Sequence, residues 1–136
     1  MIEAHDLTRK FGDFTAVAGV SFALSEGEIV GILGPNGAGK TTTIRMLTGF
    51  LPPSSGRVTL GGRDLFGNAP DAVAVRRDLG YLPESVALYP EMRVAEYLRF
   101  RAELKRVDRR KRDDAVDGVI DDTSLEEVRD VLIAEL

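Results

Sequence analysis

Residues 34–41 of this chain, Gly-Pro-Asn-Gly-Ala-Gly-Lys-Thr, are the residues best suited to chemistry. They match the pattern G-x-x-x-x-G-K-[ST], in which backbone N–H groups of a glycine-rich loop surround phosphate groups. Residues 28–33 before the loop form a short apolar run that is typical of a buried strand. Residues 40–50 after it have the apolar spacing of a helix. A strand, a glycine loop and a helix N-terminus in this order predict a nucleoside triphosphate site.

The types of residue in the loop predict their roles. Lys40 should place its ammonium group against the β- and γ-phosphates. The hydroxyl of Thr41 is the expected Mg²⁺ ligand, because Mg²⁺ takes few protein ligands together with phosphate oxygens. Thr42 is placed to donate to the α-phosphate. The expected phosphate-binding set is Gly34, Pro35, Asn36, Gly37, Ala38, Gly39, Lys40, Thr41 and Thr42.

Two other interpretations of the loop are weaker. A glycine-rich turn that merely joins a strand to a helix has no need of Lys-Thr at positions 40 and 41. A dinucleotide-binding fingerprint, counted from Gly37, would require a third glycine where the chain has Thr42. The loop therefore favours a triphosphate over a dinucleotide.

Composition restricts the class of protein. The 136 residues are 43% hydrophobic, which is enough for one compact core. A net charge of −4 gives no reason to expect nucleic acid as a partner. The lack of cysteine excludes disulfides and thiolate-bound metals and suits a reducing cytosol. Since no 18-residue apolar stretch and no apolar signal segment occur, we do not expect these residues to span a membrane.

Charge is unevenly distributed near the C-terminal end. Residues 105–112 hold six basic residues and one aspartate, whereas residues 113–136 hold nine acidic residues and one arginine. We interpret the basic run as the solvated surface of two helices joined by a turn, because no aromatic residues alternate with the charges. The alternative is a contact with anionic lipid or nucleic acid.

Apolar periodicity predicts the remaining elements. Alternation predicts half-buried, antiparallel strands over residues 2–7 and 20–24. Two further strands are expected at residues 57–60 and 79–82, and the second of them is expected to lie in the core. Helices are expected at residues 70–78, 94–105 and 109–120. Two overlapping capping boxes, begun by Thr123 and Ser124, predict another helix start. Its apolar stripe runs to Leu136, so we expect the chain to be interrupted there.

Several segments occur in the order known from one family: residues 7–12, 16–22, 34–43, 53–56, 79–84 and 94–98. Together they resemble the N-terminal half of an ABC-transporter ATP-binding subunit, with the likeness strongest over residues 1–105. The resemblance implies an α/β P-loop NTPase fold with a RecA-like core, an antiparallel β subdomain and the beginning of a helical subdomain, and thus an incomplete domain. The β subdomain and core would cover residues 1–93, and the helical subdomain residues 94–136.

The resemblance adds two site residues. Phe11 falls where the family has an aromatic residue that stacks on adenine, which implies ATP; the alternative is a core aromatic at a strand end. Glu84 falls at the Q-loop position, where the family usually has glutamine touching Mg²⁺ and the attacking water. A carboxylate also ligates Mg²⁺, so Thr41 and Glu84 become the expected metal ligands, and Glu84 and Lys40 the expected catalytic residues. The alternative for Glu84 is an exposed loop acid.

The resemblance also implies partners. The chain would work as a dimer with a second ATP-binding subunit, peripherally on the cytoplasmic face of a membrane, bound to a permease that Tyr89 and Tyr97 face. Glu84 favours export, and no nucleic acid is expected. His5 is expected to be an ordinary strand residue, because the family's catalytic histidine falls further towards the C-terminus.

The sequence lacks the family's remaining hydrolytic parts: the Walker B strand and its glutamate, the switch histidine and the signature segment. The expected function is therefore ATP binding without hydrolysis by this chain, and coupled hydrolysis by a full-length subunit. One alternative is a nucleotide-binding module without turnover, or one paired with a separately encoded half. Another is a non-transport ABC ATPase, which duplicated cassettes or basic insertions would favour. A GTPase or kinase is disfavoured, because no Asn-Lys-x-Asp motif occurs.

Overall fold

The computed structural model describes residues 1–68 and 70–136 and forms two compact units, Met1–Tyr81 and Leu82–Leu136. Each unit has its own buried cluster, and each is described by itself. The functional regions expected at residues 1–93 and 94–136 stay a prediction.

The first unit contains an antiparallel sheet with the strand order β2-β1-β3-β4. Its strands are β1 (Ile2–Phe11), β2 (Phe14–Leu24), β3 (Ser55–Leu60) and β4 (Arg63–Asp64). The predicted strands at residues 2–7, 20–24 and 57–60 are confirmed, and each is longer than predicted. β1 and β2 pair from Ile2 opposite Leu24 to Phe11 opposite Phe14. Gly12 closes this tight hairpin with a φ of 57°, which glycine adopts without strain.

Two helices complete the first unit. Helix α1 (Lys40–Leu47) contributes the buried side chains Met46 and Leu47 to a cluster with Leu7, Val17 and Val58 of the sheet. Helix α2 (Asp71–Arg77) adds Val75 to the same cluster and confirms the helix predicted at residues 70–78. The start of α1, and with it the glycine loop, is therefore anchored by the packing of its last turn on the sheet.

The two predicted core strands, residues 28–33 and 79–82, are wrong for this structure. Neither segment has strand geometry, and in residues 1–68 and 70–136 no segment pairs with either. Ile29 and Leu33 are 103% and 94% exposed, and Leu82 is 82% exposed. A central strand needs backbone partners along its edges, and the described residues supply none. Val30 and Ile32 instead line an apolar cavity of about 630 Å³ with β2 and α1.

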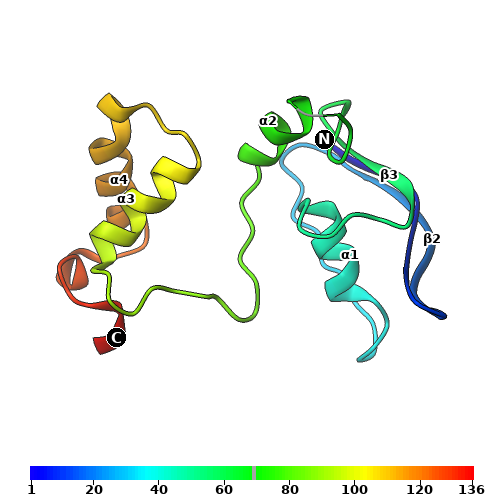
Figure 1. Ribbon diagram of the computed structural model, residues 1–136, viewed down its shortest axis with the longest axis horizontal. Coiled ribbons are helices and arrows are strands. Elements are labelled where there is room, and N and C mark those ends of the chain that lie inside the picture. The colour runs from blue at the N-terminus through cyan, green and yellow to red at the C-terminus, as the bar shows by residue number, and fades with distance from the viewer. Residues whose placement is uncertain (69) are drawn as a thin grey trace. The chain divides into compact units, whose positions relative to one another are not determined.

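The second unit consists of two helices side by side (Figure 1), α3 (Val94–Leu104) and α4 (Arg112–Asp122). Ala95, Val116 and Ile120 are buried between them, and Leu98 and Leu125 pack against these three. The helix predicted at residues 94–105 is confirmed. The helix predicted at residues 109–120 begins as a 3₁₀ turn, η1 (Arg109–Lys111), and continues as α4.

The predicted helix start at Thr123 and Ser124 is wrong, because both residues end α4 instead. Ser124 has a φ of 54°, and its N–H donates to the Asp121 carbonyl at 3.2 Å. The N–H of Leu125 donates to the Ile120 carbonyl at 3.0 Å, which completes a Schellman motif. The Thr123 hydroxyl donates to the Val119 carbonyl at 2.6 Å. Two 3₁₀ turns follow, η2 (Glu126–Val128) and η3 (Ile133–Glu135). In the described part of the chain, no helix is both long and apolar enough to cross a bilayer.

Candidate functional site

The glycine loop leads directly into α1 and leaves three backbone donors at the helix start. The first N–H group of the helix with a backbone acceptor is that of Thr43, which donates to the Gly39 carbonyl at 2.8 Å. Within the described chain, the N–H groups of Lys40, Thr41 and Thr42 form no backbone hydrogen bond. These donors share the positive end of the helix dipole. This end of α1 is therefore suited to an anion.

Strand β2 fixes the position of this helix start. Gly39 has a φ of 83°, and a Cβ atom built there would lie 2.4 Å from the Ala16 carbonyl oxygen and 3.0 Å from Val17 Cγ2. Only glycine fits this approach between loop and strand. Gly37 has the same φ of 83°, but a Cβ there would meet nothing within 4 Å. Sequence reasoning missed the role of Ala16 and Val17, since no local pattern relates them to residue 39.

Lys40 curls back over the loop. Its Nζ atom donates to the carbonyls of Gly34 at 2.6 Å and Pro35 at 2.7 Å. The Ala38 N–H donates to the same Pro35 carbonyl at 3.2 Å, which closes the turn. Both partners of the ammonium are neutral, and in residues 1–68 and 70–136 Lys40 forms no ion pair. Its positive charge is therefore uncompensated at the loop, as a phosphate-binding lysine requires.

The donor set fits a Mg²⁺ triphosphate better than a metal alone. The described residues contain no group of three His, Cys, Asp or Glu side chains that could hold a metal ion. Thr41 is exposed, and its hydroxyl is one hard oxygen ligand. Mg²⁺ characteristically combines such a ligand with phosphate oxygens and water. The loop residues Gly34 to Thr42 thus lie together as predicted, and their individual contacts with nucleotide stay predictions.

Phe11 lies at the exposed end of β1 and not in the buried core. Phe11 is 47% exposed, and the guanidinium carbon of Arg9 lies 4.7 Å from the centroid of its ring. Arg9 is held there by a hydrogen bond from Nη1 to the Pro52 carbonyl at 2.8 Å. Arg9 therefore supports Phe11 by a cation–π contact. Sequence reasoning missed Arg9, although its position two residues before Phe11 places both on one face of the strand.

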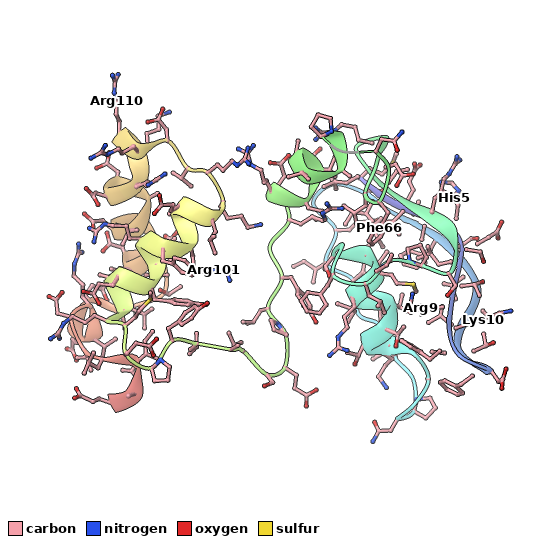
Figure 2. All side chains as sticks on the ribbon, in the orientation of Figure 1. His5, Arg9, Lys10, Phe66, Arg101 and Arg110 are labelled. Atoms are coloured by element: carbon pink, nitrogen blue, oxygen red, sulfur yellow. The ribbon has the colours of Figure 1, made fainter. Side chains whose placement is uncertain are left out.

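The other predicted site residues have simpler surroundings. Glu84 is exposed and belongs to the second unit, so its expected contacts with Mg²⁺ and water stay predictions. In that unit, the Tyr89 ring contacts those of Tyr97 and Phe100 at centroid distances of 6.4 and 5.5 Å. His5 is a residue of β1, as expected, and its imidazole lies on the surface of the sheet, 3.9 Å from Glu3 (Figure 2).

Comparison with known proteins agrees with this geometry. The family model described as ABC transporter matches residues 17–136. This chain belongs to the ABC transporter family. It is 48% identical over 100 residues to the probable multidrug ABC transporter ATP-binding protein YbhF of Escherichia coli (strain K12), covering 74% of this chain and 17% of that protein. It is 40% identical over 125 residues to the spermidine/putrescine import ATP-binding protein PotA of Pseudomonas aeruginosa (strain UCBPP-PA14), covering 92% and 33%.

Solved structures share the fold of this family member. An ATP-binding subunit of an ABC transporter superposes with a TM-score of 0.84 at 28% identity, covering 100% of this chain and 55% of that one. A dimeric ATP-binding cassette, bound to ADP and Pi in a post-hydrolysis state, superposes with a TM-score of 0.84 at 23% identity. The comparison covers 63% of that second chain. The predicted P-loop NTPase fold is confirmed. This chain spans less than two thirds of each of these solved structures and a third or less of the curated relatives named above.

Proposed function

We propose that this chain binds Mg²⁺-ATP at residues 34–42 as part of an ATP-binding subunit that drives a separate membrane permease. The observation that carries the proposal is the start of α1, where three N–H donors and the uncompensated Lys40 ammonium converge. Such an arrangement binds the β- and γ-phosphates of a nucleotide. The names of the relatives and the family model support the transport role.

Individual residues have stated roles in this proposal. Phe11 stacks its exposed face on adenine, while Arg9 covers the other face. Thr41 and Glu84 would ligate Mg²⁺, Glu84 would position the attacking water in the full-length subunit, and Lys40 would stabilise charge on the γ-phosphate. When bound, Mg²⁺ would neutralise negative charge on the phosphate oxygens.

The wider assembly is also proposed. A second ATP-binding subunit would complete the site, which a dimeric structural neighbour supports. The pair would lie on the cytoplasmic face of the membrane against the permease, with Tyr89 and Tyr97 towards it. The relatives include both a multidrug transporter and polyamine importers, so export rests on Glu84 alone.

The decisive test replaces Lys40 and measures Mg²⁺-ATP binding by titration calorimetry. Lys40→Ala should abolish binding and leave the circular dichroism spectrum unchanged, because the side chain is bound only to loop carbonyls. Lys10→Ala is the matched control, since Lys10 is an exposed lysine on β1 whose side chain points away from the sheet (Figure 2). Equal affinity of Lys40→Ala and the unchanged chain would reject the site.

A second measurement separates binding from turnover. We expect the 136-residue chain to release no phosphate from ATP above background, because Walker B, signature and switch residues are absent from its sequence. Turnover that Lys40→Ala abolishes would contradict this part of the proposal and would require another catalytic base.

A further inference from the structure

Four cationic side chains gather where α3 connects to α4. We call this group, Arg106, Arg109, Arg110 and Lys111, the basic corner. All four are exposed, and Arg110 extends outward from the second unit (Figure 2). Two tight turns connect the helices: Arg106, with a φ of 56°, turns the chain just after α3, and η1 begins three residues later at Arg109. The basic run is therefore concentrated at one end of the helix pair and does not spread along it.

The charge of the basic corner is not neutralised by its neighbours. In the described residues, none of its four side chains forms an ion pair. The adjacent cations differ: Arg99 contacts Asp113 at 2.8 Å, and Arg112 contacts Glu103 at 3.4 Å. Asp108, the one acid of residues 104–112, accepts from the Arg110 N–H at 2.9 Å and so caps η1. The corner keeps a net positive charge.

An exposed apolar side chain lies beside these charges. Leu104, the last residue of α3, is 58% exposed. Basic side chains next to an exposed leucine fit the interface of an anionic membrane, where headgroups meet acyl chains. Single-stranded nucleic acid would instead require exposed aromatic rings for base stacking. Residues 104–112, which include the basic corner and Leu104, contain no aromatic residue. The side-chain chemistry therefore favours lipid.

We propose that the basic corner binds anionic phospholipid headgroups and that Leu104 enters the interface beside them. The inference rests on the proposed function, which places this chain next to a membrane permease. Each basic residue near an anionic surface strengthens binding about fivefold, and the effect vanishes with added salt. The corner would hold the second unit on the lipid beside the permease.

The test is cosedimentation of the 136-residue chain with vesicles of phosphatidylcholine alone or of equal parts phosphatidylcholine and phosphatidylglycerol. The chain should bind the anionic vesicles at low salt and release them at high salt. Neutralising three corner residues together, by Arg109→Gln, Arg110→Gln and Lys111→Gln, should weaken this binding on the order of a hundredfold. The matched control makes the same change in net charge on the first unit, with Lys10→Gln, Arg45→Gln and Arg57→Gln, and should bind like the unchanged chain.

Four results would overturn the inference: no binding to anionic vesicles, equal binding to both kinds of vesicle, equal losses in the two triple variants, or tighter binding to polyuridylic acid than to the vesicles. Titration of the same samples with Mg²⁺-ATP keeps the two proposals apart. Nucleotide binding that Lys40→Ala abolishes, without binding to vesicles, would reject the basic corner and leave the proposed function in place. Vesicle binding without nucleotide binding would reject the proposed function.

Discussion

Replacing Gly39 by alanine tests whether strand β2 positions the phosphate loop. The new Cβ atom would lie 2.4 Å from the Ala16 carbonyl oxygen, which is backbone and cannot rotate away. Gly37→Ala is a close control, because Gly37 has the same φ of 83° and an added Cβ would meet no atom within 4 Å. The two variants share the conformational penalty and differ in the clash.

The magnitudes follow from these two terms. An alanine in the left-handed region lowers the free energy of unfolding by about 1–2 kcal/mol. Alanine also reduces the entropy of the unfolded chain, which offsets about 0.4–1 kcal/mol of this loss. Gly37→Ala should therefore lower the free energy of unfolding by about 1 kcal/mol. Crowding of packed atoms costs about 1–3 kcal/mol more. Gly39→Ala should therefore be less stable than Gly37→Ala by about 2 kcal/mol.

Urea unfolding without nucleotide, followed by circular dichroism, measures both values. Hydrogen exchange of residues 2–24 should show that the loss in Gly39→Ala is centred on the β1–β2 hairpin. Equal free energies of unfolding for the two variants would refute the reasoning, because the loop would then be able to move away from Ala16 without cost.

Three further predictions concern single side chains. Phe11→Ala should weaken ATP binding by about 1–3 kcal/mol, because stacking on adenine is lost. The control Phe14→Ala, on the neighbouring strand and 63% exposed, should leave the affinity unchanged. An unchanged dissociation constant for Phe11→Ala would remove Phe11 from the site. Ile120→Ala should destabilise the second unit by about 2–5 kcal/mol, because the side chain is only 1% exposed. The control Val119→Ala, at a residue that is 42% exposed, should change stability by less than about 0.5 kcal/mol. Hydrogen exchange of α4 measures the stability of both variants. Similar losses of stability in the two variants would argue against the described packing. Ser124→Gly should stabilise α4 by about 1 kcal/mol, since glycine accepts the φ of 54° without strain; faster exchange at residues 116–123 would contradict the Schellman motif.

Local patterns predicted much of the fold correctly. Alternation over residues 20–24 gave the half-buried face of β2 that contains Val20, Phe22 and Leu24. Helical spacing gave α3 and α4 to within a few residues. These patterns succeed because the elements bury a face against a partner that is present in the same unit.

The incorrect predictions have two physical causes. Residues 28–33 and 79–82 are as apolar as a core strand, but a strand depends on hydrogen-bond partners that apolarity does not supply. The capping boxes at Thr123 and Ser124 failed because the same hydroxyl and backbone groups can end one helix or begin another. Here the Thr123 hydroxyl and the N–H groups of Ser124 and Leu125 donate to carbonyls of the last turns of α4.

The sequence by itself identified the family and predicted the phosphate-loop chemistry, because residue types at short spacing carry both. The tertiary structure decided which groups surround the predicted site residues: the Ala16 oxygen lies against Gly39, the Arg9 guanidinium lies over Phe11, and loop carbonyls hold Lys40. It also decided that Arg106, Arg109, Arg110 and Lys111 share one exposed end of a helix pair. Contacts such as that between residues 16 and 39 arise from packing around a common core, which short-range sequence patterns do not encode.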